Sequence, residues 1–133
     1  MNLIFFFLLF LIGMGMEEEE KPGFVQTRAP QVTYDRLRGL AHSPAYPYRT
    51  MAGMNKVIFQ TFLHHKPWDL GLKWRKPQKA GEDTGFVQVN IQLPQELADK
   101  VRIQAAECGV SVASFAYTAL YWWAVYIHSP SKK

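Results

Sequence analysis

The clearest pattern of apolar and polar residues lies in the C-terminal part of the chain and begins at Phe86. Residues 86–93, FVQVNIQL, alternate between apolar and polar from Val87 onward, which is typical of a β-strand with one buried face. The apolar side chains on that face are Val87, Val89, Ile91 and Leu93. Pro94 follows, and proline suits the first turn of a helix because the N–H that it lacks would have no partner there. The pattern therefore predicts a strand that leads directly into a helix.

Two helices are predicted after this strand. The first ends near Cys108, Gly109 breaks it, and Ser111 is a favourable N-cap for the second. Apolar residues at helical spacing mark a buried stripe on each helix: Leu97, Val101, Ala105 and Cys108, then Val112, Phe115, Ala116, Ala119, Leu120, Trp123 and Ile127. The opposite face of the second helix has no charged residue and carries Ala113, Tyr117, Tyr121, Trp122 and Val125. Because an exposed helix face is normally polar, we expect this face to pack on a second dimer or on the chain's own N-terminal part.

The preceding residues show weaker patterns. Residues 21–47 contain four prolines and are expected to be mostly irregular, with a short helix near residues 34–40. Residues 51–65 have helical character, because apolar residues recur four apart at Met54, Ile58 and Phe62. Residues 66–85, rich in Pro, Gly and Lys, are expected to form an arm that leads into the strand. We find no internal repeat and no low-complexity segment.

The N-terminal residues 3–16, which begin with Leu3 and end with Met16, are all apolar or glycine, and four glutamates follow them. The run is shorter than the roughly 18–20 residues that span a membrane, and it lacks the basic start of a secretory signal. Three interpretations stay open: a short membrane anchor, a helix packed on the rest of the protein, or translated sequence upstream of the working start. If the run inserts, the positive-inside rule places the rest of the protein in the cytoplasm.

Length and charge point to a partner. The chain has 133 residues, and the strand and helices predicted at 86–128 are too few to bury a large core alone, so a partner chain is expected. The formal charge is +4, but residues 21–79 carry eleven Lys and Arg against two Asp, whereas residues 86–128 are nearly neutral. This distribution favours a polyanion as partner. The single cysteine, Cys108, excludes an internal disulfide.

The order of strand, proline, helix, glycine turn and serine-capped helix over about residues 86–127 resembles the ribbon-helix-helix family of DNA-binding proteins, which includes the Arc and MetJ repressors. In that family two chains each contribute one strand, and the antiparallel ribbon enters the DNA major groove. The resemblance implies the fold class: mainly α with one short strand, an intertwined dimer joined through a two-stranded ribbon, with an N-terminal extension. The parts would be an apolar segment with its acidic block (1–20), a basic, aromatic-rich extension and arm (21–85), the ribbon-helix-helix domain (86–128) and a tail (129–133).

The resemblance assigns base contacts to the polar face of the strand, at Gln88, Asn90 and Gln92. The first two are similar to the Gln and Asn of the Arc strand, but Arc has an arginine at the third position. Arginine to guanine is the commonest specific contact, whereas Gln and Asn pair bidentately with adenine, so this strand lacks the family's residue for guanine. The alternative is that the three residues are simply the solvated face of an amphipathic edge strand.

Phosphate contacts are expected at two places. The family directs the N-terminus of its second helix at a phosphate, which implies contacts at Ser111 and at the backbone N–H of Val112. The basic residues just before the strand are expected to follow the phosphate backbone or enter the minor groove: Lys73, Arg75, Lys76 and Lys79. The alternative for these four is a solvated basic linker.

The predicted function is sequence-specific binding of double-stranded DNA by a cytoplasmic homodimer, as a transcriptional repressor or a plasmid- or phage-type regulator. Higher oligomers would form through Tyr117, Tyr121, Trp122 and Val125. No enzyme, metal site or cofactor is predicted, because the histidines lack metal-ligand spacing and no Gly-rich phosphate loop is present. The alternative is a small membrane-associated assembly protein with apolar helices at residues 3–16 and 110–127, the second ending in an aromatic cluster before Lys132 and Lys133.

Overall fold

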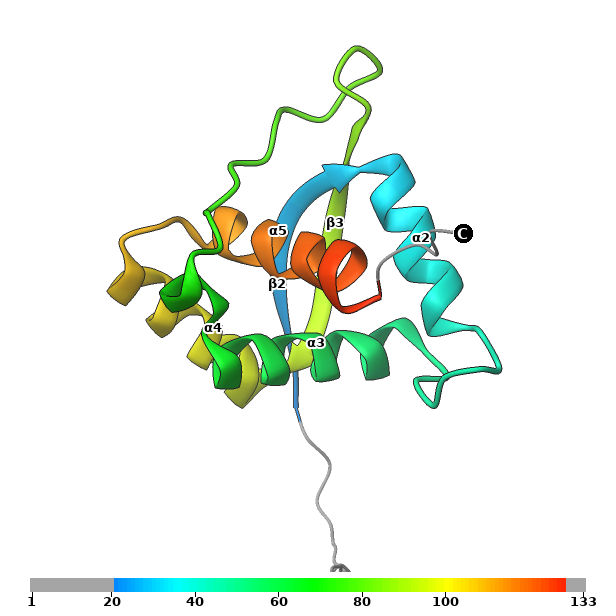
Figure 1. The fold of residues 1–133 in the computed structure, drawn as a ribbon, viewed down its shortest axis with the longest axis horizontal. Helices are drawn as coiled ribbons and strands as arrows, with labels where there is room; N and C mark the ends of the chain where they lie inside the picture. The colour runs from blue at the N-terminus through cyan, green and yellow to red at the C-terminus, as the bar shows by residue number, and fades with distance from the viewer. Residues whose placement is uncertain (1–20, 129–133) are drawn as a thin grey trace, which may run out of the picture.

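The computed structural model describes residues 21–128, so the predictions for residues 3–16 and for the tail lie outside the described range. The described chain forms two strands, four α-helices and two short helical turns (Figure 1). In chain order these are β2 (Pro22–Pro30), α2 (Gln31–Ala41), α3 (Met51–His65), the 3₁₀ turn η1 (Pro67–Leu70), β3 (Phe86–Pro94), α4 (Gln95–Cys108), α5 (Val112–Trp122) and the π-helical turn η2 (Trp123–Ile127).

β2 and β3 pair antiparallel along their whole length, with Gln26 opposite Asn90 at the centre. Both strands of the ribbon therefore come from one chain. The expected fold class, with one strand per chain and a ribbon shared between two chains, is wrong. The reason is that residues 21–47, expected to be mostly irregular, supply β2 and α2. The expected helices near residues 34–40 and over 51–65 are confirmed as parts of α2 and α3.

The chain contains two copies of one strand–helix–helix unit, β2–α2–α3 and β3–α4–α5. Each strand enters its helix through a proline with extended backbone, Pro30 (ψ 143°) and Pro94 (ψ 142°). Each second helix is capped by a hydroxyl that accepts a hydrogen bond from the backbone N–H three residues on, at Thr50 for α3 and at Ser111 for α5. The two units therefore share their order of elements and their helix starts, although no repeat is found in the sequence.

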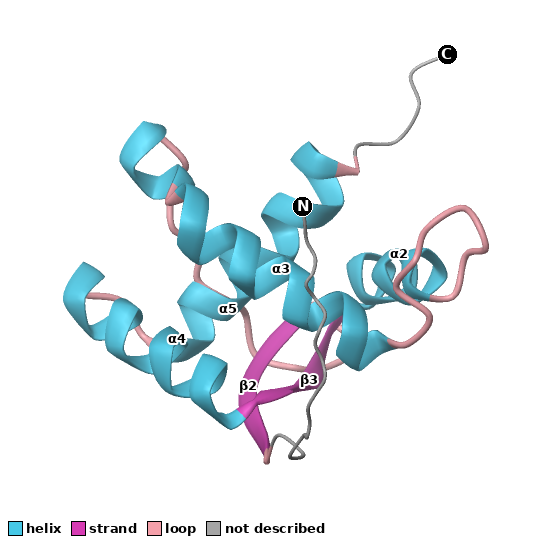
Figure 2. Ribbon diagram, turned by 90° about the horizontal axis from the view of Figure 1, so that it is seen from below, coloured by secondary structure: helices cyan, strands magenta, loops and turns pink. Residues whose placement is uncertain are grey.

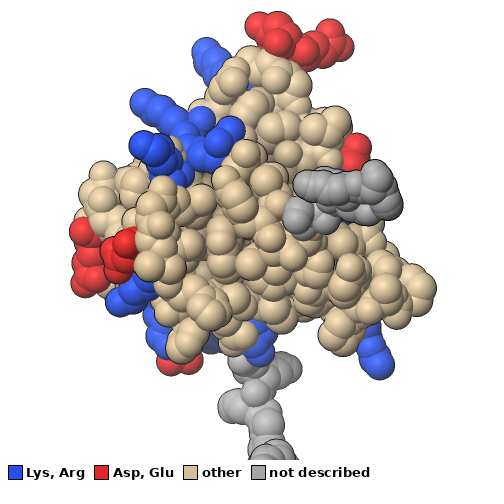
Figure 3. All heavy atoms as spheres, viewed as in Figure 1, with Lys and Arg blue, Asp and Glu red and all other residues tan. Residues whose placement is uncertain are grey.

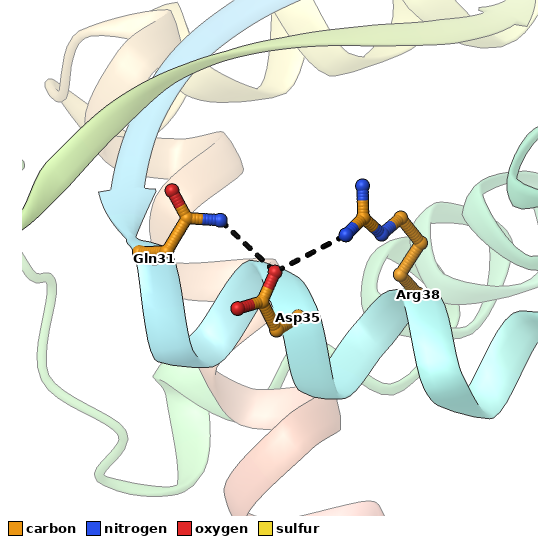
Figure 4. A network of polar contacts seen from close by, with 3 residues as sticks. All are labelled: Gln31, Asp35 and Arg38. Atoms are coloured by element: carbon orange, nitrogen blue, oxygen red, sulfur yellow. Dashed lines mark hydrogen bonds and ion pairs between the residues drawn. The ribbon is translucent and has the colours of Figure 1, made fainter.

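The first turns of α2 and α4 carry the same polar network, which supports this repetition. In α2, the Gln31 amide donates to the Asp35 carboxylate at 2.9 Å, and the Arg38 guanidinium lies 3.4 Å from that carboxylate (Figure 4). The α4 counterparts are Gln95, Asp99 and Arg102, at 2.9 Å and 4.0 Å. The crossed backbone contacts also match: the Gln31 N–H donates to the Gly85 carbonyl and the Gln95 N–H to the Lys21 carbonyl. Each helix start is thus tied to the residue that precedes the other strand.

The helices pack on one side of the ribbon. In Figure 1, α3 and α5 lie in front of the two strands, and in the view from below the strands lie at the lower edge with the helices above and beside them (Figure 2). The ribbon side chains on the helix side are buried and form part of the core, among them Val25, Ala29, Val89, Ile91 and Leu93. Burial of this apolar layer holds the ribbon to the helices.

An aromatic cluster joins the two units. The ring of Phe62, in α3, is fully buried and contacts Phe115 and Trp122 of α5 as well as Trp68 and Trp74 from the segment that follows α3. Of these residues Trp122 lies on the second apolar face of α5, so that face packs in part on α3, within the chain's own N-terminal part.

We expect Phe62→Ala to lower the free energy of unfolding by about 3–5 kcal/mol, because it removes a buried ring and leaves a cavity at the junction of the two units. Urea unfolding followed by circular dichroism measures the change. Ile103 is 59% exposed, so Ile103→Ala is the matched surface control and should change stability by less than about 0.5 kcal/mol. Equal losses in the two variants would contradict the central position of Phe62.

Candidate nucleic-acid interface

The face of the ribbon turned away from the buried layer carries six side chains, here called the outer face: Phe24, Gln26 and Arg28 of β2, and Gln88, Asn90 and Gln92 of β3. Five of them are exposed and Arg28 is half-buried. The polar orientation predicted for the three β3 residues is confirmed. The three β2 residues were missed, because β2 itself was not predicted.

The pairing register arranges these side chains as three cross-strand pairs: Phe24 with Gln92, Gln26 with Asn90, and Arg28 with Gln88. Side chains opposite one another on the same face of a ribbon lie about 4.5–5.5 Å apart at their Cβ atoms. Phe24 and Arg28 are four positions apart, so at about 3.4 Å per residue the outer face extends roughly 13 Å along the ribbon. It is a continuous strip of amide groups with an aromatic ring toward one end and a guanidinium toward the other.

A helix N-terminus lies beside each end of this strip. A shallow depression at one end is lined by Gln26, Arg28 and Gln88 together with Ala113 from the first turn of α5. The equivalent depression at the other end is lined by Asn90, Gln92 and Phe24 together with Ala52 from the first turn of α3. The first backbone N–H groups of a helix have no partner within the helix, and the helix dipole favours negative charge there.

The position of α5 relative to the ribbon is fixed by a long-range hydrogen bond. The hydroxyl of Thr27, which is buried on the helix side of β2, donates to the Ala113 carbonyl at 2.6 Å. Ser111 caps the helix next to this contact by accepting from the Ser114 N–H at 3.0 Å. Ser111 is exposed and Val112 half-buried, so these two predicted phosphate-contact residues lie at an accessible helix end.

The basic arm, residues 66–85, runs along α5 on the helix side of the molecule. The backbone N–H of Arg75 donates to the buried Thr118 hydroxyl at 2.9 Å, and the Arg75 guanidinium lies 3.8 Å from the centre of the Tyr121 ring. Figure 3, in the same view as Figure 1, shows Lys and Arg side chains gathered at the upper left over this segment. All four of the phosphate contacts predicted in this arm are exposed: Lys73, Arg75, Lys76 and Lys79. The structure does not bring the arm onto the outer face.

The titratable side chains of the described residues form one cluster with shifted pKa values, near His128. No group of three His, Cys, Asp or Glu side chains within residues 21–128 is placed to hold a metal ion. Directly after η2, His128 Nε2 lies 3.0 Å from the Tyr48 hydroxyl, and Arg36 donates to the His128 carbonyl. Burial, followed by the Arg36 charge, lowers the pKa of His128, and burial raises the pKa of Tyr48. Both groups are therefore neutral at pH 7, and their contacts fasten the C-terminal end of η2 to the first unit.

Comparison with protein-family models, with curated proteins and with solved structures finds no match for this chain. Within the described residues no single helix is long and apolar enough to cross a membrane, although Gln95–Cys108 and Val112–Ile127 meet the criteria together across a bend of 104°. The middle of α5, including Phe115 and Leu120, is buried in the protein core.

We expect Ser111→Ala to lower the free energy of unfolding by about 1 kcal/mol, because the Ser114 N–H loses its capping partner. Ser111→Asp restores an acceptor at the same place and should keep stability close to that of the wild type. Thermal and urea unfolding of the three proteins give the comparison. A loss as large in Ser111→Asp as in Ser111→Ala would show that the hydroxyl acts otherwise than as a cap.

Proposed function

We propose that this protein binds double-stranded DNA through the outer face of its β2–β3 ribbon. The major groove of B-DNA is about 12 Å wide and admits a two-stranded ribbon. The outer face carries the side chains suited to base edges, since Gln and Asn pair bidentately with adenine and Arg with guanine. One observation carries the proposal: five amide and guanidinium side chains, together with Phe24, are directed to the side of the ribbon that no described helix covers.

The two helix N-termini beside the outer face support this proposal. A ribbon in the major groove has a phosphate backbone on each side, and each of α3 and α5 begins beside one end of the outer face. Backbone N–H groups at helix N-termini bind phosphate oxygens and thereby fix the orientation of a protein on the duplex. Ser111 and Val112 would act at the start of α5, and Thr50 and Met51 are the corresponding residues of α3.

The resemblance of residues 86–127 to ribbon-helix-helix proteins supports the same function. In that family the ribbon that enters the groove is formed by two chains, and here two units of one chain form a ribbon. Repression is the larger role in the family, so we propose transcriptional regulation as the cellular role.

The predicted base contacts are tested by selecting duplexes from a random pool with the full chain at physiological salt and measuring Kd by fluorescence anisotropy. We expect Asn90→Ala to raise the Kd for the selected site about tenfold, because one bidentate pair contributes about 1–3 kcal/mol of discrimination. Gln60, an exposed residue of α3, provides the matched control Gln60→Ala, which should leave Kd unchanged. Selection without enrichment, or equal effects of the two substitutions, would refute base contact by the ribbon.

The predicted phosphate contact at α5 is tested with Ser111→Asp, which keeps the cap but adds a negative charge where we place a phosphate. We expect weaker binding to all duplexes regardless of sequence, with unchanged stability. Gln60→Glu adds the same charge elsewhere and serves as control. If the two substitutions weaken binding equally, the effect is one of net charge and the contact at Ser111 is excluded.

We propose a role for the basic arm other than the one predicted from the sequence. Because the arm lies along α5, we propose that Lys73, Lys76 and Lys79 attract DNA through long-range electrostatics, while Arg75 is held on Tyr121. We expect the triple Lys→Gln variant to slow association at low salt while the selected sequence stays the same. A change in the selected sequence would instead place these lysines in the groove.

A further inference from the structure

The two ends of the outer face are chemically different, although the backbone around them repeats. The residue of β3 that corresponds to Arg28 is Gln92, and the residue of β3 that corresponds to Phe24 is Gln88. One end of the ribbon therefore presents Arg28 beside Gln88, and the other presents Phe24 beside Gln92. A ribbon built from two identical chains would present the same pair at both ends.

We propose that a single chain binds a single non-palindromic DNA site in one fixed orientation, a proposal that rests on the function proposed above. At the Arg28 end the guanidinium contacts the O6 and N7 acceptors of a guanine. At the other end Gln92 contacts an adenine, and the exposed ring of Phe24 packs on a thymine methyl group. The roughly 13 Å of the outer face covers about four base pairs at 3.4 Å per step, with Gln26 and Asn90 over the middle.

The flanks of the ribbon add to this asymmetry. At the Phe24 end a depression beside the start of α3 is lined by Lys21 and Lys56 together with Gly53 and Gln92. The depression at the Arg28 end, beside the start of α5, is lined by Arg28, Thr27 and Ala113 and by no lysine. The α3 flank therefore presents the Lys21 ammonium group, whereas the α5 flank presents the Arg28 guanidinium.

The pairing of β2 with β3 within one chain also removes the need for a second copy. In a ribbon shared by two chains, recognition of DNA requires a dimer, and affinity depends on protein concentration. Here both strands, both helix N-termini and all six outer-face side chains belong to residues 24–113 of one chain. One chain therefore contains every group to which we assign a contact with DNA.

The test compares the full chain with Arg28→Gln and Gln92→Arg, using selection from random duplexes and native mass spectrometry of the complexes. For the wild type we expect one chain per site and an enriched sequence that is not its own reverse complement, with a conserved guanine near one end. Arg28→Gln should abolish the preference at that position alone and raise Kd for the wild-type site about tenfold. Gln92→Arg should add a guanine preference at the opposite end and make the enriched sequence more nearly palindromic.

Three outcomes would overturn the inference. Two chains on a palindromic site would show that a dimer recognises DNA and would leave the proposed DNA binding intact. If Arg28→Gln weakened binding equally whatever base stood at each position of the site, Arg28 would be a phosphate contact and not a base contact. Absence of DNA binding by the wild type, with folding verified by circular dichroism, would refute the inference and the proposed function together. Unfolding curves of both variants control for changes in stability. Gln92→Arg is expected to add a guanine preference, and damage to the fold could not produce such a gain.

Discussion

The antiparallel pairing of β2 with β3 is the contact on which the rest of this structure depends. It joins segments separated by α2, α3 and the basic arm, and it fixes where α2 and α4 begin, because each strand leads through a proline into one of them. An isolated two-stranded ribbon is at best marginally stable in water. Here the buried face of the ribbon is covered by α3 and α5, so the pairing and the helix packing stabilise each other. The entropy lost in closing a long loop grows slowly with loop length, which makes such a distant pairing affordable within one chain.

The small size of the C-terminal unit explains why its need for a packing partner was predicted correctly, although the origin of the second strand was not. Residues 86–128 are too few to bury a large core, so they need a partner. Apolar residues on both faces of α5 indicate the same need, and Tyr117 and Trp122 are indeed buried. The incorrect step was to form the ribbon from the strands of two chains. The partner is the first unit, whose helix α3 inserts Phe62 between Phe115 and Trp122.

β3 could be predicted from the sequence and β2 could not, for a physical reason. The buried positions of β3 include Val89, Ile91 and Leu93, which alternate with amides and create a strong period of two. The buried positions of β2 are Gly23, Val25, Thr27 and Ala29, of which Val25 alone is a large aliphatic residue, and a phenylalanine lies on the opposite face. Pro22 and Pro30 at its ends are signals of irregular chain. β2 is ordered by its pairing with β3, and pairing between segments distant in the sequence leaves no local pattern of apolar and polar residues. Half of the outer face was therefore visible in the sequence, and the half with Arg28 was not.

The small buried residues that hid β2 also position the candidate site. Gly23 leaves no room for a larger residue, because a Cβ there would lie 3.1 Å from that of Ala98 in α4. The absence of a side chain at this position lets the helix approach the strand closely. At Thr27 the hydroxyl, rather than an aliphatic group, holds the Ala113 carbonyl. The next residue along the pleat is Arg28, which points to the outer face. Adjacent residues of one strand thus place the start of α5 on one side and a guanidinium on the other, so the separation between a phosphate-binding helix end and a base contact is fixed by a buried hydrogen bond and the geometry of the pleat. An apolar residue at position 27 would strengthen the sequence signal for a strand and remove the contact that sets this separation.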